Sequence, residues 1–257
     1  MMRMIVLLML ALVSVASCSV KEDRSDCPAR LILDFKDVDT AVFKSLNLLV
    51  TNEGETVFSD SVGADDFTKD YVRDVPHGSL RVNVWAGDGD RVVHEHGVVI
   101  PYGCECPPIY MHSFIADTEG ELWRETVCLK KNHCRLTVMM EGVEKIPYSL
   151  TFKGNVDGYR LDGQPSSGDF SCVAYPAGTR ESQALLPRQT DSSLLMEVDD
   201  GTSVIKTFAI GEYIASSGYD WTSGNLEDVT IVIDYYITYI KITIQEWDRE
   251  YVYNITL

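Results

Sequence analysis

The residues with the clearest chemical signal lie near the N-terminus, where an apolar run ends in Val15-Ala16-Ser17-Cys18. Small residues directly before a cysteine are typical of a lipoprotein processing site, and the run before them has the length of a secretory signal. Acyl chains such as palmitate would attach to the sulfur and amine of Cys18, each buried methylene adding about 0.8 kcal/mol of membrane affinity. The alternative is a secretory signal with an incidental cysteine. The sequence favours lipidation at Cys18 and removal of residues 1–17.

A short charged segment, Ser19-Val20-Lys21-Glu22-Asp23, follows this cysteine. Lys21, Glu22 and Asp23 resemble the export signal that sends lipoproteins of Bacteroidales-like bacteria to the outer face of the outer membrane. A merely solvated, flexible tether would have the same composition. We expect residues 18–28 to form a lipidated tether and the protein to be displayed on the cell surface.

The remaining cysteines are even in number, as is typical of a disulfide framework in an exported protein. They are the candidate disulfide residues Cys27, Cys104, Cys106, Cys128, Cys134 and Cys172. On an extended strand Cys104 and Cys106 would lie about 7 Å apart on one face, which is awkward for a mutual bond. Cys128 and Cys134 could close a short loop. The pairing stays open, and free buried thiols are the alternative.

Other chemistry has weak support in the sequence. His94-Glu95-His96 could form a zinc-like set with Cys104 and Cys106, but no feature orients these pairs toward each other. Acidic residues are numerous and scattered, and neither a Gly-x-Ser-x-Gly elbow nor a phosphate-binding glycine loop occurs. We therefore expect a protein that is not an enzyme, with no metal and no cofactor. Tryptophans 85, 123, 221 and 247 are expected in the core.

The charge of the chain limits the classes of partner that it is expected to bind. It has 39 acidic and 22 basic residues and a formal net charge of −17. Such a surface repels phosphate backbones, which argues against nucleic-acid binding. It also argues against flat adsorption on an anionic leaflet, so attachment should come from the lipid.

After residue 28 the chain has the two-residue alternation of apolar and polar side chains that is typical of an all-β protein. Alternating apolar residues predict strands at 30–35 and 80–85, and a hairpin is expected where residues 47–50 and 55–59 flank Thr51-Asn52-Glu53-Gly54. Residues 37–46 have helical spacing over a short span and predict a helix. Residues 91–100 are a further expected strand.

The strand pattern restarts after Cys134. Strands are expected at 135–140, 148–153, 168–175, 193–198, 229–236, 238–247 and 251–257. Short strands at regular spacing argue for sandwiches and against a βαβ fold. We predict an N-terminal β-sandwich domain at 29–128 and a C-terminal one at 129–257.

Several stretches together carry a family resemblance. They are Cys27-Pro28, residues 80–87, residues 128–138, Gly211-Glu212-Tyr213-Ile214, Tyr219-Asp220-Trp221 and residues 242–247. The chain resembles the FimB-like family of fimbrillin anchors, minor fimbrial subunits of type V pili in Bacteroidales-like bacteria. The resemblance implies two tandem transthyretin-like β-sandwich domains and a role in holding the fimbrium base to the outer membrane and limiting fibre length. The segment 104–108 departs from the family pattern and leaves the disulfides open.

The resemblance implies major or accessory fimbrial subunits as partners. Strand addition could join such subunits, since main-chain hydrogen bonds give affinity and alternate apolar side chains give register. The candidate polymer-docking strand contains Ile240, Ile242, Ile244, Trp247, Tyr251 and Tyr253. An internal hairpin completing the second sandwich would have the same alternation. A first strand that is kept in place would fill its own groove and end growth.

The alternative function is a surface-exposed β-sandwich adhesin or glycan-binding lipoprotein outside any pilus. Co-purification with a polymerised subunit would favour the fimbrial function.

Overall fold

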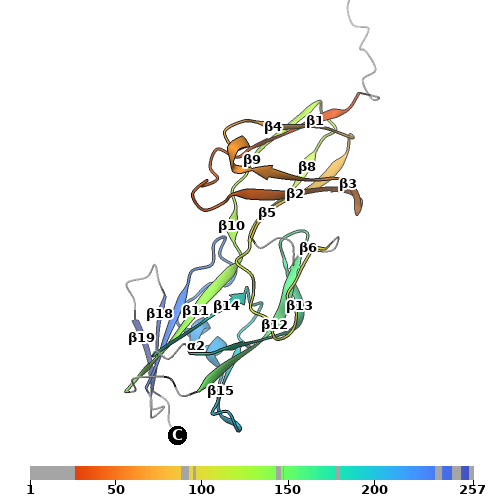
Figure 1. Cartoon of the computed structure of the whole chain (residues 1–257). Coiled ribbons are helices and arrows are strands. Elements are labelled where there is room, and N and C mark those ends of the chain that lie inside the picture. The colour runs from red at the N-terminus through yellow and green to blue at the C-terminus, as the bar shows by residue number, and fades with distance from the viewer. Residues whose placement is uncertain are drawn as a thin grey trace, which may run out of the picture.

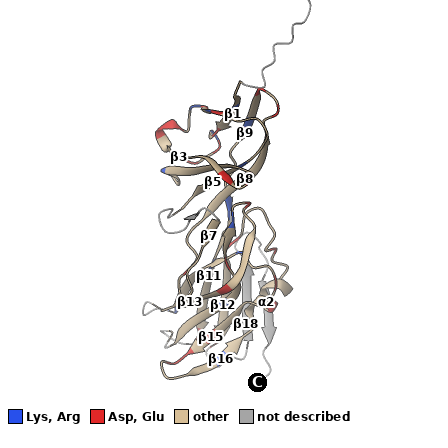
Figure 2. Ribbon diagram, turned by 90° about the vertical axis from the view of Figure 1, so that its right-hand side faces the viewer, with Lys and Arg blue, Asp and Glu red and all other residues tan. Residues whose placement is uncertain are grey.

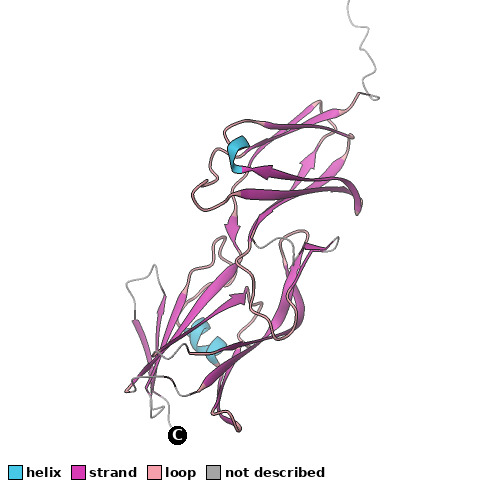
Figure 3. Ribbon diagram, in the orientation of Figure 1, coloured by secondary structure: helices cyan, strands magenta, loops and turns pink. Residues whose placement is uncertain are grey.

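The computed structural model describes residues 27–87, 93–94, 97–142, 146, 148–176, 180–234, 239–244 and 250–254. Its regular structure is almost entirely strand (Figure 3), which confirms the predicted all-β class. Within these residues no helix has the length and apolarity needed to cross a membrane.

Two facing sheets form a first unit. Its elements are β1 (Ala29–Asp34), β2 (Ser45–Asn52), β3 (Glu55–Gly63), the 3-10 turn η1 (Ala64–Asp66), β4 (Tyr71–Val75), β5 (Ser79–Ala86), β8 (Tyr110–Asp117), β9 (Leu122–Thr126) and β10 (Lys130–Lys131). One sheet has the order β4-β1-β9 and the other β10-β8-β5-β2-β3. β1 pairs antiparallel with β4 and parallel with β9.

Alternation along these strands produces the first core. Leu31 and Leu33 of β1 are fully buried, and every second residue of β2 and β5 packs against them. Because successive side chains point to opposite faces of a strand, this pattern fixes which face is covered.

The predicted hairpin is confirmed. β2 and β3 pair antiparallel around Glu53 and Gly54, which have φ values of 50° and 91°. Positive φ at both central residues matches the twist of the flanking strands, and glycine adopts it without steric cost.

The helix predicted at residues 37–46 is wrong. Residues 36–42 form turns, and β2 already begins at Ser45. A single helical contact, from the Phe43 amide to the Asp39 carbonyl, is present. Forming one helical turn fixes the backbone dihedral angles of several residues and gains only one hydrogen bond. A segment of this length therefore does not sustain a helix.

A second unit contains the remaining elements. They are β6 (Val93–His94), β7 (Gly97–Val99), β11 (His133–Glu141), β12 (Ser149–Arg160), β13 (Pro165–Ala174), β14 (Glu181–Pro187), β15 (Leu195–Asp199), β16 (Val204–Phe208), α2 (Ile210–Ser216), β17 (Val229–Asp234), β18 (Tyr239–Ile244) and β19 (Glu250–Asn254). One sheet has the order β14-β11-β17-β18-β19; the other has the order β16-β15-β12-β7-β6, with β13 also paired to β12. Their facing side chains form the second core.

The boundary between the two units does not fall at a single point in the sequence. β7 pairs with β12, and Ile100 and Cys106 lie in the second core, before the chain returns to β8 of the first unit. The predicted domain ranges 29–128 and 129–257 therefore stay a prediction, and they leave out this excursion. Leu49 and Trp85 on the outer face of the first unit also pack into the second core.

The two units are stacked end to end in an elongated molecule (Figures 1 and 2). β1 lies in the upper unit, while β18 and β19 lie in the unit at the opposite end (Figure 1). β10 lies between the units, where Figure 2 shows basic residues on the connection.

Candidate functional site

The predicted lipidation and export residues, Cys18, Lys21, Glu22 and Asp23, lie outside the described residues and stay predictions. The described chain begins at Cys27, whose carbonyl oxygen lies 2.7 Å from Nε2 of His77. The other ring nitrogen, Nδ1, lies 2.7 Å from the carbonyl oxygen of Thr118. His77 thus fixes the point at which the chain enters the first sheet.

β1 follows directly and is held on both sides. Its residues pair with β4 and β9 from Ala29 to Asp34. Its exposed face carries Arg30, which lies 3.5 Å from Asp74 of β4. An exposed pair of this kind adds little stability, so the buried leucines hold the strand.

The six candidate disulfide cysteines are free thiols in the described part of the chain. Cys27, Cys104 and Cys128 are exposed, whereas Cys106, Cys134 and Cys172 are buried in the second core. The predicted disulfides are therefore not confirmed, and the structure has the alternative arrangement of buried thiols.

Burial controls the chemistry of the three inner thiols. It raises the pKa of Cys134 and of Cys172 to about 12, and that of Cys106 further. A thiol with so high a pKa is almost entirely protonated at neutral pH and is therefore a poor nucleophile. No group of metal-binding side chains occurs within the described residues.

The candidate docking strand is divided between β18 and β19. β18 pairs with β17 on one side and β19 on the other, so β19 is the edge of its sheet. Ile240, Ile242 and Ile244 lie on β18, and Tyr251 and Tyr253 on β19, while Trp247 lies outside the described residues. The hairpin completes the sheet and also presents a free edge, so both predicted roles stay open.

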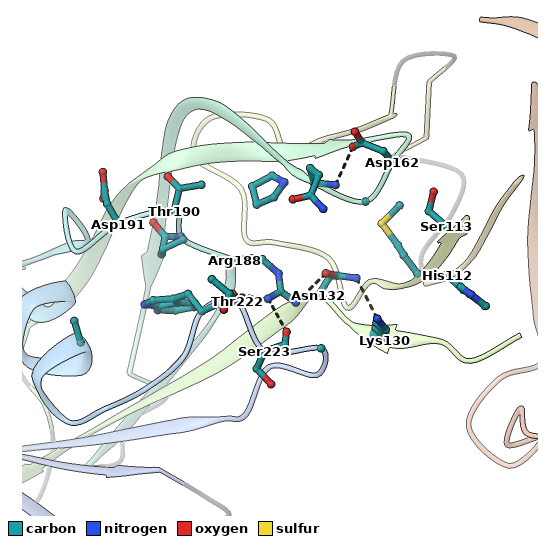
Figure 4. Close-up of a pocket in the computed structure, with 18 of the residues that line it drawn as sticks. His112, Ser113, Lys130, Asn132, Asp162, Arg188, Thr190, Asp191, Thr222 and Ser223 are labelled. Carbon is teal, nitrogen blue, oxygen red and sulfur yellow. Dashed lines mark hydrogen bonds between the residues drawn. The ribbon is translucent and has the colours of Figure 1, made fainter. Parts of the chain in front are cut away.

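A pocket of about 640 Å³ lies where the two units meet (Figure 4). β8 contributes residues 111–113, the connection contributes Lys130 and Asn132, and the second unit contributes residues 162–165, 188–192 and 221–224 together with Ala215 of α2. Sequence reasoning missed this pocket. Its only local signal is the polar run that starts at Arg188, directly after β14.

A buried hydrogen-bond network connects several of the lining residues. The Tyr159 hydroxyl donates to the Asn132 carbonyl oxygen and accepts from the Arg188 amide at 2.8 Å. The Arg188 guanidinium donates to the Asn132 side-chain oxygen at 3.1 Å and to the carbonyl oxygens of Trp221 and Ser223 (Figure 4). Desolvation lowers the pKa of Arg188.

A second set of contacts holds the connection between the units. Asp228 Oδ1 accepts from Lys131 Nζ at 2.5 Å and from the Arg135 amide at 2.8 Å. The Lys131 amide donates to Asn225 Oδ1 at 2.9 Å. These bonds join the connection to the loop before β17, so the junction is a fixed part of the fold.

Comparison with solved structures identifies proteins that share this architecture over most of their length. The fimbrial anchor protein Mfa2 from Porphyromonas gingivalis superposes with a TM-score of 0.61 and 13% identity, over 86% of this chain and 98% of that one. The chain has the fold of a fimbrial anchor protein. At the level of the fold, the predicted resemblance to the FimB-like fimbrillin anchors is confirmed.

Other proteins share the fimbrial-anchor fold. A candidate polysaccharide-binding protein from Bacteroides thetaiotaomicron has a TM-score of 0.64 at 12% identity, over 89% of this chain and 98% of that one. A candidate adhesin from Bacteroides ovatus has a TM-score of 0.62 at 12% identity, over 90% and 96%. No protein-family model and no curated protein sequence matches the chain.

Proposed function

We propose that the chain is a lipid-anchored minor subunit of a type V fimbria, which attaches the base of the fibre to the outer membrane. Its fold supports this, because a protein with the same fold is a fimbrial anchor. The acylated Cys18 would hold the protein on the cell surface after export directed by residues 21–23. On this proposal the protein binds and holds its partners and catalyses no reaction.

The position of β1 is the observation that carries the proposal. β1 lies between β4 and β9, and its core-facing leucines are fully buried. The first sheet therefore has its own strand at this position and offers no groove for a strand donated by another subunit. With β1 retained, the chain is continuous from the lipid to the folded body, and fibre growth ends at this unit.

The polymer contact then falls at the other end of the molecule. β19 is the edge strand there, and an edge strand presents unpaired main-chain groups to an incoming strand. The proposed partners are major or accessory fimbrial subunits.

The anchoring role is tested in cells that make the fimbria. Deletion of the protein, or Cys18→Ala, should release fibres into the medium, whereas Cys27→Ala should leave them attached because Cys27 lies outside the processing site. Normal cell-bound fibres in the deletion strain would contradict the proposal.

Retention of β1 has its own test. Mass spectrometry of the mature protein should find acylated Cys18 as the first residue. An N-terminus just before or within residues 30–35 would mean that β1 is removed, and the growth-ending role would be lost.

The docking end can be located by crosslinking. A photoreactive residue in place of Tyr253 on β19 should crosslink to a fimbrial subunit. The same residue in place of Val72, which is exposed on the edge strand β4 at the other end, should not. The reverse result would place the partner on the first unit.

A further inference from the structure

The pocket between the units is lined by a cation, Arg188, to which no carboxylate of the described residues is directly bonded. Arg188 is half-buried, and its three side-chain hydrogen bonds all go to neutral oxygens. No carboxylate in the described part of the chain forms an ion pair with it; Asp220 acts on it only through space. A half-buried charge with no directly bonded counter-ion gains from one, so this site is suited to an anion.

The guanidinium has donors left for such an anion. It carries five N–H groups, and its hydrogen bonds to Asn132, Trp221 and Ser223 use three of them. The remaining donors are on Nε and Nη2. A carboxylate can accept both in the parallel geometry that makes arginine pairs strong.

The acidic residues at the pocket are already engaged. Asp162 pairs with Arg160 at 2.9 Å and accepts from the Gln164 amide. Asp191 accepts from the Ser193 amide and from the Asn155 side chain, each at 2.8 Å. They hold the loops at the rim, and neither neutralises Arg188.

The rest of the lining is mixed, with the side chains of Met111, Pro165 and Trp221 beside hydroxyl and amide groups. Ser113, Gln164, Thr190, Ser192 and Thr222 place hydroxyl and amide groups around the opening. None of the large apolar side chains exposed on the described surface lines this pocket. A pocket of apolar side chains with several hydroxyl and amide groups can accept a hydroxyl-rich ligand.

We propose that this pocket binds a carboxylate-bearing saccharide, with the acid group on Arg188 and the ring hydroxyls on the rim. Its volume suits a short oligosaccharide. The ligand would touch both units of the protein. This site is independent of the fimbrial proposal: a protein that fails to bind sugar could still anchor a fibre, and the reverse.

Calorimetric titration tests the site on the chain from residue 19 onward, which contains every described element. The probes are N-acetylneuraminic acid and trigalacturonic acid, with neutral galactotriose and a short peptide ending in a free carboxylate as comparisons. We expect one acidic saccharide to bind at one site, about tenfold or more tighter than the neutral one, because charge-assisted bonds are lost without the acid.

Three variants connect binding to this pocket. Ala215→Trp fills the pocket from the exposed side of α2 and should abolish binding, whereas Ser216→Trp, on the next exposed residue outside the lining, should not. Arg188→Lys keeps the positive charge but loses the paired, parallel N–H donors of the guanidinium. It should weaken binding about tenfold.

Three results would overturn the proposal. They are no binding of either acidic saccharide at millimolar concentration, equal binding of galactotriose, and binding of the peptide alone. Unchanged binding in Ala215→Trp would place the ligand elsewhere and would also overturn it.

Discussion

The buried thiols show how the environment of single residues sets their chemistry. Cys106, Cys134 and Cys172 lie in the second core, while Cys27, Cys104 and Cys128 face solvent. Only the thiolate reacts at an appreciable rate, and burial suppresses it.

Thiol counting should therefore separate the cysteines into two classes. In the native chain from residue 19 onward, Cys27, Cys104 and Cys128 should react rapidly with an aromatic disulfide reagent at pH 8. All six should react in urea without a reductant, because unfolding exposes the rest. A total below six in urea would instead show disulfides, as the sequence alone suggested.

The same thiols predict a fall in stability at alkaline pH. Folding raises the pKa of Cys134 and Cys172 from 9.0 to about 12. The stability that the two neutral thiols contribute is therefore complete below pH 9 and is lost as the pH rises toward 12. The free energy of unfolding should fall by about 1.4 kcal/mol per pH unit for each thiol. Urea titrations between pH 8 and pH 11 measure it. The double variant Cys134→Ala, Cys172→Ala should show a smaller slope; an unchanged slope would assign the effect to other groups.

Tyr159 is the residue on which the junction network depends. Its side chain is 1% exposed, and its hydroxyl bonds to both Asn132 and Arg188. Tyr159→Phe should lower the free energy of unfolding by about 1–3 kcal/mol, because it leaves buried partners unsatisfied. Urea denaturation measures the change. Tyr175→Phe, at a side chain that is 76% exposed, is the control and should have no effect. Equal stability of the two variants would contradict the role of the network.

At the scale of elements, close backbone approach determines where β7 lies. A Cβ atom at Gly158 of β12 would meet the Val98 carbonyl oxygen at 1.9 Å, and one at Gly97 would meet the Tyr159 carbonyl oxygen at 2.1 Å. Only residues without a side chain allow this contact.

Gly158→Ala should accordingly separate β7 from β12. The Ile100 amide, which donates to the Asp157 carbonyl oxygen at 2.7 Å, should exchange with deuterium about tenfold or more faster. Gly63→Ala, where a Cβ meets open space, is the matched control. Unchanged exchange at Ile100 would mean that the backbones shift apart without loss of pairing.

At the scale of the whole molecule, the fixed connection determines the relation of the two units. Asp228 accepts from both Lys131 and Arg135, and Lys131 is bonded again through its amide. On the proposed function, tension between the lipid and the fibre would pass through this junction, and a loose connection would extend first.

Asp228→Ala should loosen this connection. Trypsin cleavage after Lys130 or Lys131 should become about tenfold faster, since local opening exposes the chain to the protease. Asp200→Ala, at an exposed turn far from the connection, should leave the rate unchanged. Equal rates in both variants would mean that other contacts hold the units together.

The sequence by itself determined the all-β class, the first strand and the β2–β3 hairpin. These features depend on side-chain alternation and on positive φ at a turn, which are local properties of the chain. It also pointed to the FimB-like fold through residues spread over the whole chain. β4, β8, β9, β10, β14, β16 and α2 were not identified as elements, because their patterns are short or interrupted.

The tertiary structure alone decided where β7 lies, which thiols are buried and where Arg188 is placed without a directly bonded carboxylate. Each depends on the meeting of segments far apart in sequence: β7 with β12, Cys106 with Cys172, and the end of β14 with the connection between the units. No local period encodes such long-range approach. Of the candidate docking strand, only β19, which holds Tyr251 and Tyr253, lies at a sheet edge, and only the strand order β17-β18-β19 determines which strand is last.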